Sequence, residues 1–374
     1  MKFVLAPDKF KGSLTGIEFC NAVEEGIKRE MPTCEVVKLP LADGGDGTFE
    51  ILDYHLNGEK ITIEVQDPLF RPTNASYLFL EKSKTAFIEM AEASGMKLLS
   101  DKEQNCFYTS TFGTGLLIVS AINRGAKNIL IGIGGSATND CGIGMAFALG
   151  YQFLDENHDE LIPIGKNLSK IKKIDTTNVI PTLTDVNFQV ACDVSNPLFG
   201  KNGAAYVYAP QKGASAMEVV ALDIGLRNMA SLFQDQFEID IQNIKGAGAA
   251  GGMGAGTKVF LDADLVSGID LIKDLIGFES KIQNADWMIT GEGKLDHQTL
   301  SGKTIQGVIA SSKKYNIPVA AFCGSITLNQ NELDKVGILY SSSIMEQAES
   351  IEDAMANPSD YLKNISSEFI KKNY

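Results

Sequence analysis

The chain has 374 residues, of which 44% are hydrophobic and 21% charged, and it carries a formal net charge of −14. This composition excludes a disordered chain, and the length predicts two globular domains rather than one small core. The acidic balance argues against nucleic acid and acidic membrane surfaces as main partners, while leaving room for a locally basic pocket that binds an anionic substrate. Six scattered cysteines without a CxxC pair, together with three histidines, give no zinc-type cluster and are typical of a reducing cytoplasm.

The first 58 residues predict strand, loop and helix, repeated once. Lys2 to Ala6 is expected to be a buried strand rather than a signal peptide, because Pro7 and the charged residues after it end the apolar run. Thr15 and Glu18 have the spacing of a capping box, which predicts the start of a helix. A second strand, Val36 to Leu41, ends in an Asp- and Gly-rich turn. Open α/β sheets bind ligands at such carboxyl ends of strands.

The pattern then changes, because three expected strands follow one another without helices between them: Lys60 to Asp67, Ala75 to Glu81 and Thr85 to Met90. They indicate a second domain or an insertion. Farther along, the hydrophobic pattern predicts a helix at Ala216 to Phe237 and a strand at Trp287 to Thr290. No run approaches the ~18–20 apolar residues that a membrane span needs.

The stretch Asn128 to Gly144 combines an apolar strand, a glycine turn and a polar helix start. Glycines let backbone N–H groups converge on an anion, and a helix N-terminus favours negative charge, so this stretch predicts a phosphate site. An ordinary tight turn is the alternative. Gly132, Gly134 and Ala137 also follow the spacing of a dinucleotide fingerprint, with Asp155 about 20 residues farther on. An NAD(P)-dependent hydroxy-acid dehydrogenase is therefore a rival interpretation.

Other polar turns follow expected strands. Asp43 and Asp46 are carboxylates that can hold Mg²⁺ or orient a hydroxyl, and Asp193 follows a strand at a position favoured for a base. Two further turns combine lysines with other polar groups: Lys9, Lys11 and Ser13 in the first, and Glu292, Lys294 and Asp296 in the second. Each has an ordinary alternative as a turn or helix cap. Together they supply the carboxylates, lysines and candidate base that phosphoryl transfer needs.

Several ordered motifs make the chain resemble the bacterial glycerate kinase family of the glycerate 2-kinase type. The matching stretches run nearly end to end: residues 6–14, 40–48, 89–95, 111–115, 132–142, 191–214, 246–256 and 290–303. Two positions depart from the family pattern, since Lys9 stands where a serine is usual and Cys141 where a glycine is usual.

The resemblance implies ATP- and Mg²⁺-dependent phosphorylation of D-glycerate to 2-phosphoglycerate. It also implies a two-domain α/β protein with a discontinuous Rossmann-like parallel-sheet domain, a second mixed α/β domain and a cleft between them. We expect the first domain to comprise residues 1–58, about 95–150 and 265–374, and the second about 59–94 and 151–264. Phosphorylation at the 3-hydroxyl and a non-catalytic organic-acid receptor stay open as alternatives, as does the oligomeric state.

The expected roles divide into four groups. Catalytic candidates are Asp193 as the base, Lys11 and Lys294. The substrate-binding candidates are Lys9, Ser13, Asp43, Ser136 and Asn139. Glycine turns expected to hold ATP contain Gly132, Gly134, Gly135, Gly248, Gly251 and Gly252. Expected metal ligands are Asp46, Asp140, Glu292 and Asp296.

Overall fold

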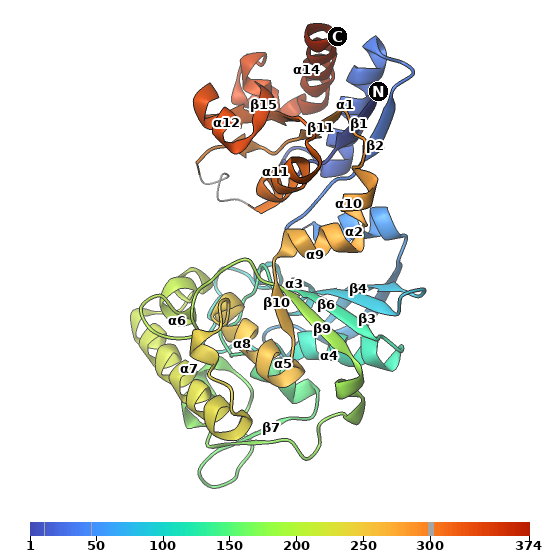
Figure 1. Ribbon diagram of the computed structural model, residues 1–374. Coiled ribbons are helices and arrows are strands. Elements are labelled where there is room, and N and C mark those ends of the chain that lie inside the picture. The colour runs from blue at the N-terminus through green and yellow to red at the C-terminus, as the bar shows by residue number, and fades with distance from the viewer. Residues whose placement is uncertain (11, 46, 298–302) are drawn as a thin grey trace. The chain divides into compact units, whose positions relative to one another are not determined.

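The computed structural model describes residues 1–10, 12–45, 47–297 and 303–374, and it divides into two compact units (Figure 1). Unit 1 consists of Met1–Asp43, Glu50–His55 and Ile269–Tyr374, and unit 2 of Gly44–Phe49 and Leu56–Gly268. Helices α2 (Thr48–Leu56) and α9 (Gly268–Leu275) contain residues of both. Each unit is built on its own sheet, which confirms the predicted α/β class with one parallel and one mixed sheet.

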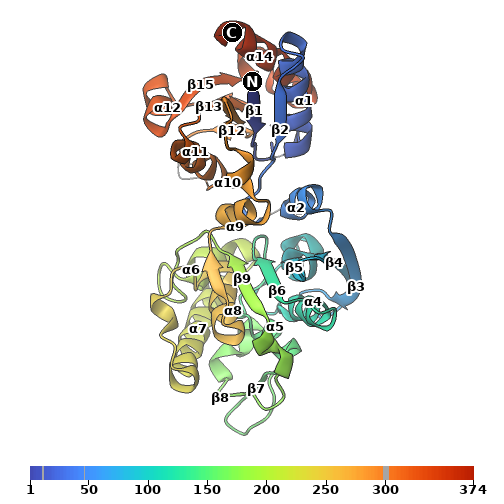
Figure 2. The same cartoon turned by 45° about the vertical axis from the view of Figure 1, so that its right-hand side comes forward.

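Unit 1 contains a parallel sheet in the order β15-β13-β11-β1-β2. The strands are β1 (Lys2–Leu5), β2 (Glu35–Lys38), β11 (Trp287–Thr290), β13 (Val319–Cys323) and β15 (Ile338–Ser343), beside the short pair β12 (Lys294–Leu295) and β14 (Ser325–Ile326). The helices are α1 (Gly16–Glu30), α10 (Phe278–Lys281), α11 (Lys303–Tyr315), α12 (Gln330–Val336), α13 (Ile351–Ala356) and α14 (Pro358–Asn373). Figure 2 shows strands from both ends of the chain side by side in this sheet.

Both faces of the unit 1 sheet are covered, as its continuous apolar strands require. Phe3 and Leu5 point to one face and join a core with side chains of α1 and α14, while Val4, which alternates with them, is also fully buried. Helices α1 and α14 pack closely, because a Cβ on Gly26 would lie 2.7 Å from Ser366 Cβ. A larger residue at position 26 would therefore push the two helices apart.

The start of α1 confirms the capping box expected from the sequence. The Thr15 hydroxyl accepts a hydrogen bond from Glu18 N at 3.2 Å, and the Glu18 carboxylate accepts one from Thr15 N at 2.8 Å. The two contacts satisfy backbone donors that the first helical turn leaves open. The helix thus begins where the sequence alone places it.

Unit 2 contains a mixed sheet in the order β10-β9-β6-β5-β4-β3, in which β10, β9, β6 and β5 are parallel and β5, β4 and β3 form antiparallel pairs. The strands are β3 (Glu59–Gln66), β4 (Pro72–Leu80), β5 (Thr85–Glu89), β6 (Asn128–Gly132), β9 (Asn187–Ala191) and β10 (Asp264–Val266), beside the pair β7 (Gln152–Leu154) and β8 (Lys173–Asp175). The helices are α3 (Ala91–Ser94), α4 (Phe112–Asn123), α5 (Ile143–Ala148), α6 (Ala204–Tyr208), α7 (Ala216–Phe237) and α8 (Ala249–Leu261).

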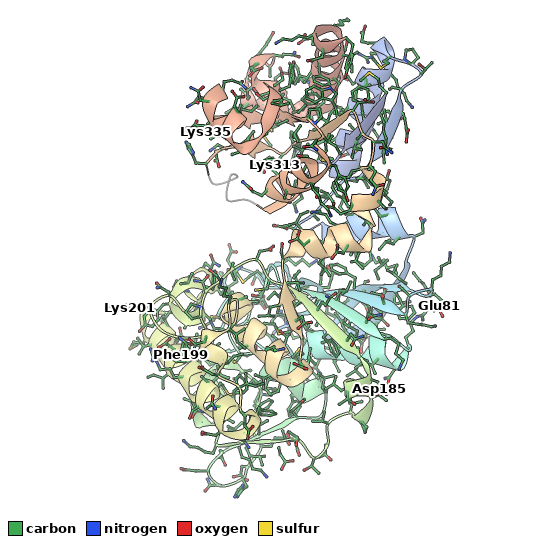
Figure 3. All side chains as sticks on the ribbon, viewed as in Figure 1. Glu81, Asp185, Phe199, Lys201, Lys313 and Lys335 are labelled. Carbon is green, nitrogen blue, oxygen red and sulfur yellow. The ribbon has the colours of Figure 1, made fainter. Side chains whose placement is uncertain are left out.

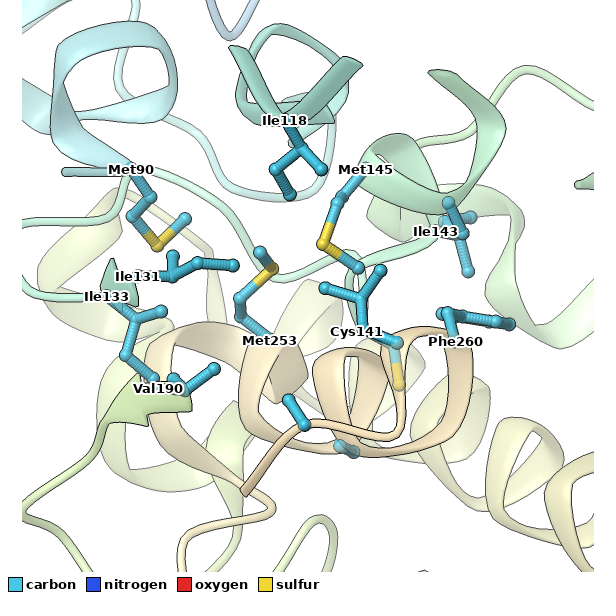
Figure 4. Close-up of a cluster of buried hydrophobic side chains, with 14 of the residues drawn as sticks. Met90, Ile118, Ile131, Ile133, Cys141, Ile143, Met145, Val190, Met253 and Phe260 are labelled. Carbon is cyan, nitrogen blue, oxygen red and sulfur yellow. The ribbon is translucent and has the colours of Figure 1, made fainter. Parts of the chain in front are cut away.

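One apolar core joins the unit 2 sheet to these helices. Ile131 and Val190 enter it from the strands, and Met145 and Met253 from α5 and α8 (Figure 4). The methionine side chains fill irregular gaps between helix and sheet. This core fixes the backbone from which the loops after β5, β6 and β9 emerge.

Residues 95–150 differ from the expected domain division, because they belong to unit 2 rather than to the unit that holds both chain ends. The physical reason is strand pairing: β6 lies between β5 and β9, with Ile131 opposite Ile88 on one side and Val190 on the other. The segment after β2 also differs, since Gly44–Phe49 belongs to unit 2.

Charged side chains project from exposed positions of both units, for example Glu81, Asp185 and Lys201 in unit 2 and Lys313 and Lys335 in unit 1 (Figure 3). Among the described residues, no helix is both long enough and apolar enough to cross a membrane.

Candidate active site

In unit 2 the loops after the parallel strands β5 and β6 meet at the carboxyl edge of the sheet. Met90 N, just after β5, donates to Gly132 O at the end of β6 at 2.9 Å, and Ala137 N donates to Ser94 O at 2.9 Å. The segment Gly44–Phe49 lies at the same edge, because Phe49 N donates to Glu89 Oε1 at 2.9 Å. Open α/β sheets bind ligands at this edge.

The glycines after β6 have two different surroundings. A Cβ on Gly132 would lie 2.6 Å from Gly44 O, so this glycine permits the close approach of another chain segment. Gly134 and Gly135 are exposed, and Gly135 has a φ of +69° that favours glycine. Of these three glycines, only Gly134 and Gly135 have exposed backbone that a ligand could contact.

Lys212 holds the loop that follows these glycines. Its ammonium donates hydrogen bonds to Ser136 Oγ at 2.6 Å and Thr138 O at 2.8 Å, and the residue is only 4% exposed. Burial lowers the pKa of Lys212 to about 8, against the opposing effects of Cys106 and Asp140. The sequence reasoning missed Lys212, because its partners lie more than 70 residues away and its own turn has no motif of a site.

Asn139, expected to bind substrate, is fully buried, and neither of its side-chain polar atoms has a hydrogen-bond partner among the described residues. The same holds for Thr138 Oγ1. Buried polar groups are nearly always paired, so such atoms on one loop indicate a place where a ligand supplies the missing partners. Ser136 and Asn139 lie on the same loop, and their expected role in substrate binding stays a prediction.

Asp140 has a structural role in place of the metal-binding role expected for it. It is fully buried, and its Oδ2 accepts from Thr111 N and Thr111 Oγ1, each at 2.8 Å, and from Gly144 N at 3.2 Å. Its Oδ1 accepts from Gly142 N at 3.2 Å. Burial raises the pKa of Asp140, and these hydrogen bonds oppose that rise. A carboxylate so enclosed by backbone donors ties the loop to the start of α4.

The glycine-rich stretch 246–256 packs against the same loop and is not an open cradle for ATP. A Cβ on Gly251 would overlap Thr138 O and lie 2.5 Å from Asn139 Cα, and one on Gly252 would lie 3.0 Å from Cys141 Cα. A Cβ on Gly248 would overlap Pro197 O. The space beside these three glycines is therefore filled by protein backbone, which corrects their expected role as nucleotide ligands.

The dinucleotide interpretation fails on local geometry. The helix after the glycine turn, α5, begins only at Ile143 and has six residues, so no helix N-terminus lies at Ala137. Asp155 follows β7, outside the main sheet, and its Oδ1 accepts from Asn157 N at 2.8 Å and Asp159 N at 3.0 Å. Asp155 therefore closes a turn, and the rival dehydrogenase hypothesis loses its motif.

Two further residues that the sequence singles out, Asp193 and Cys141, lie in unit 2. Asp193, the expected base, follows β9, is half-buried and accepts a hydrogen bond from Gly268 N at 3.0 Å through Oδ1. Cys141, which replaces a family glycine, has a φ of +56°. That left-handed conformation explains the usual glycine, and the full burial of Cys141 explains how a small apolar side chain is accommodated.

In unit 1 a different acidic residue, Asp8, lies at the carboxyl edge of the sheet. Asp8 follows β1, and its Oδ2 accepts a hydrogen bond of 2.7 Å from Thr304 Oγ1 on α11. Burial raises the pKa of Asp8, the Thr304 hydroxyl and Lys9 N lower it, and the nearby charge of Asp43 raises it further. Asp8 is not among the site residues expected from the sequence, although its position after an expected strand was an available signal.

The remaining candidates of unit 1 lie in two loops. Glu292 follows β11 and is partly buried, and Lys294 forms an ion pair of 3.0 Å with Asp296. The cation beside the Asp296 carboxylate is therefore the Lys294 ammonium. In the first loop, Lys9 is partly buried, and Ser13 lies in a tight turn where Ser13 N donates to Phe10 O at 3.0 Å.

Lys11, expected to be catalytic, and Asp46, expected to bind metal, lie outside the described residues. Within the part of the chain that the structure describes, no group of three or more His, Cys, Asp or Glu residues is arranged to hold a metal ion by itself.

Two α/β units with polar loops at the carboxyl ends of parallel strands define an enzyme architecture for small polar ligands. The model of the glycerate kinase family matches residues 3–372, so the chain belongs to that family.

Individual relatives agree along the whole chain. It is 42% identical to a protein of Bacillus subtilis (strain 168) named glycerate kinase, over 97% of this chain and 95% of the relative. It is also 42% identical to the glycerate 2-kinase of Escherichia coli (strain K12), over 92% and 89% of the two chains. A crystal structure from Salmonella typhimurium LT2, assigned as glycerate kinase 2, superposes with a TM-score of 0.90 at 38% identity, covering 100% of this chain and 98% of the other.

Proposed function

We propose that the protein is an ATP-dependent glycerate 2-kinase, which transfers the γ-phosphoryl group to the 2-hydroxyl of D-glycerate. The observation that carries this proposal is the end-to-end match to the glycerate kinase family, including a relative whose name specifies position 2. That name favours the 2-hydroxyl over the 3-hydroxyl. Membership of a kinase family also favours turnover over a non-catalytic receptor.

The acceptor acid is proposed to bind at the loop after β6 in unit 2. Ser136 and Asn139 offer a hydroxyl and an amide, which can donate to and accept from the hydroxyl and carboxyl oxygens of a three-carbon acid. The unpartnered atoms of Asn139 support this assignment, since a ligand would satisfy them. Gly134 and Gly135 would leave the loop open at its exposed side.

For Mg²⁺, we propose Asp8 and Asp43 of unit 1 as carboxylate ligands. Mg²⁺ is usually bound through one or two carboxylates plus substrate phosphates and water, which two acids can satisfy. The charge of Asp43 already raises the pKa of Asp8, as expected for two acids close enough to share a cation. When bound, the ion would neutralise charge on the phosphates. Glu292 stays a candidate in the same unit.

The lysines are proposed to neutralise anionic groups of the substrates. This role is the one expected from the sequence for Lys9, Lys11 and Lys294, which adjoin polar turns. An ammonium stabilises charge that develops on a transferring phosphoryl group. The ion pair of Lys294 with Asp296 would orient that side chain.

Asp193 is our candidate for the general base that accepts the proton of the attacking hydroxyl. The hydrogen bond that Gly268 N donates to its Oδ1 fixes the direction of the carboxylate. Asp193→Asn should lower kcat by ~10²–10⁴-fold, the usual contribution of a general base. Turnover close to that of the wild type at neutral pH would leave Asp193 only the structural role of accepting the hydrogen bond from Gly268 N.

The activity is tested by measuring ADP release with D-glycerate and MgATP, followed by phosphorus NMR of the product. We expect ADP release that depends on glycerate and a phosphorus signal coupled to the proton at carbon 2. Coupling to the protons at carbon 3 would move the reaction to the other hydroxyl. ATP binding without glycerate-dependent ADP release would favour the receptor, and a thermal shift with NAD would revive the dehydrogenase.

A cytoplasmic location belongs to the same proposal. All six cysteines are free thiols, five of them buried, which suits a reducing compartment.

A further inference from the structure

Lys212 carries a buried positive charge that no carboxylate neutralises directly. Within the described part of the chain its ammonium makes two hydrogen bonds, to a hydroxyl and a carbonyl, and no ion pair. Lysine is almost never so buried unless it is paired, because the charge loses its hydration. Asp140 exerts an attraction, but its two oxygens are already used by Thr111, Gly142 and Gly144.

The groups around the Lys212 ammonium indicate which ligand would complete its hydrogen bonding. A lysine ammonium has three donors, and Lys212 uses two on the loop residues Ser136 and Thr138. The next residue, Asn139, has a buried amide without partners, and Thr138 has a buried hydroxyl without one. An anion with adjacent hydroxyl groups would satisfy the remaining ammonium donor and these polar atoms together.

We propose that Lys212 binds the carboxylate of the acceptor acid, in a subsite shared with Ser136 and Asn139. The proposal rests on the glycerate kinase activity proposed above and names the residue that selects an acid over a neutral polyol. A single ammonium beside one hydroxyl and one amide suits a small singly charged group, whereas a triphosphate needs several cations and backbone donors.

The direct test compares binding of D-glycerate and of D-glyceramide, its neutral analogue, by calorimetry in the presence of ADP. Lys212→Met keeps an unbranched side chain one atom shorter and removes the charge, so it should weaken D-glycerate binding ~10–100-fold and leave D-glyceramide within about twofold. Lys170→Met, at an exposed lysine of the same unit, is the matched control and should bind both as the wild type does.

Equal losses for the acid and the amide would overturn the proposal, because they would show only that Lys212 shapes the loop. An unchanged KM for glycerate with a raised KM for ATP would also overturn it, since the anion would then belong to the nucleotide. A wild-type protein that neither binds nor phosphorylates glycerate would instead remove the proposed function.

A second measurement needs no variant. A bound carboxylate stabilises the charged lysine, so glycerate binding by the wild type near pH 8.5 should take up a fraction of a proton. Proton uptake is read from calorimetry in two buffers of different ionisation enthalpy. Glyceramide should cause none, and the other titratable groups that act on Lys212, Cys106 and Asp140, are present in both experiments. Absence of uptake with glycerate would contradict the assignment.

Discussion

The Thr304 hydroxyl donates a hydrogen bond of 2.7 Å to the Asp8 carboxylate, across 296 positions of sequence. This contact joins the turn after β1 to the first turn of α11 within unit 1. It stabilises the ionised form of an acid whose pKa is raised by burial and by Asp43. Asp8 thus combines the position and the perturbed ionisation that mark functional carboxylates.

We expect Asp8→Asn to lower kcat at least ~10²-fold, because an amide cannot replace a carboxylate at a metal or proton-transfer position. Steady-state kinetics at saturating ATP and glycerate measure the effect. Asp274→Asn, at an exposed acid of α9 in the same unit, is the control and should be unchanged. Full activity of Asp8→Asn would remove Asp8 from the site.

Thr304→Val should move the acidic limb of the pH–rate profile to higher pH. The hydroxyl lowers the pKa of Asp8, so its removal raises that pKa, and the ionised form needed for activity is lost at a higher pH. The profile of kcat between pH 4 and 8 tests this. A lower kcat without movement of the limb would mean that Thr304 only supports the fold.

Gly251→Ala should destabilise unit 2 by about 2–5 kcal/mol. Residue 251 has a φ of +71°, and the new Cβ would overlap Thr138 O, so backbone strain and steric overlap add. Gly125→Ala is a matched control: its φ is +92°, but nothing lies within 4 Å of the added Cβ, so only strain of about 1–2 kcal/mol is expected. Urea unfolding of both variants compares the two, and equal losses would contradict the close packing.

Asp140→Asn should cost at least about 2 kcal/mol of stability, because its amide nitrogen would face N–H donors in a buried place. Asp155→Asn should stay within about 0.5 kcal/mol, since its two bonds use one oxygen, which asparagine retains. Thermal unfolding measures both. Destabilisation of the wild type by a chelator to the level of Asp140→Asn would instead restore the metal role of Asp140.

The pH dependence of stability should reveal the burial of Lys212. In the unfolded chain its pKa is 10.5, and burial lowers it to about 8, so between these values the unfolded state binds more protons. Stability contributed by this group therefore rises with pH across that window, by up to about 3 kcal/mol. The difference in unfolding free energy between wild type and Lys212→Met should change by this amount between pH 7 and 10. Lys170→Met should give parallel curves.

Much of the fold could be predicted because its signals are local. The capping box of Thr15 and Glu18 places the start of α1, and the pattern of apolar residues places β11 and α7 with the observed ends. The candidate loop after β6 was also predicted, since glycines and polar residues directly follow an apolar strand. The roles expected for residues within that loop stay predictions, because they depend on which groups come from elsewhere in the chain.

The sequence by itself determined the α/β class, the family and the loop that contains Ser136 and Asn139. Each of these depends on short-range residue patterns or on motifs in a fixed order along the chain. Only the tertiary structure decided that Lys212 holds this loop, that Asp140 is enclosed by backbone donors, and that Gly251 makes room for Thr138. The physical reason is that hydrogen bonding and close packing depend on distance in space. Residues remote in sequence become neighbours only after the sheet has fixed its strand order.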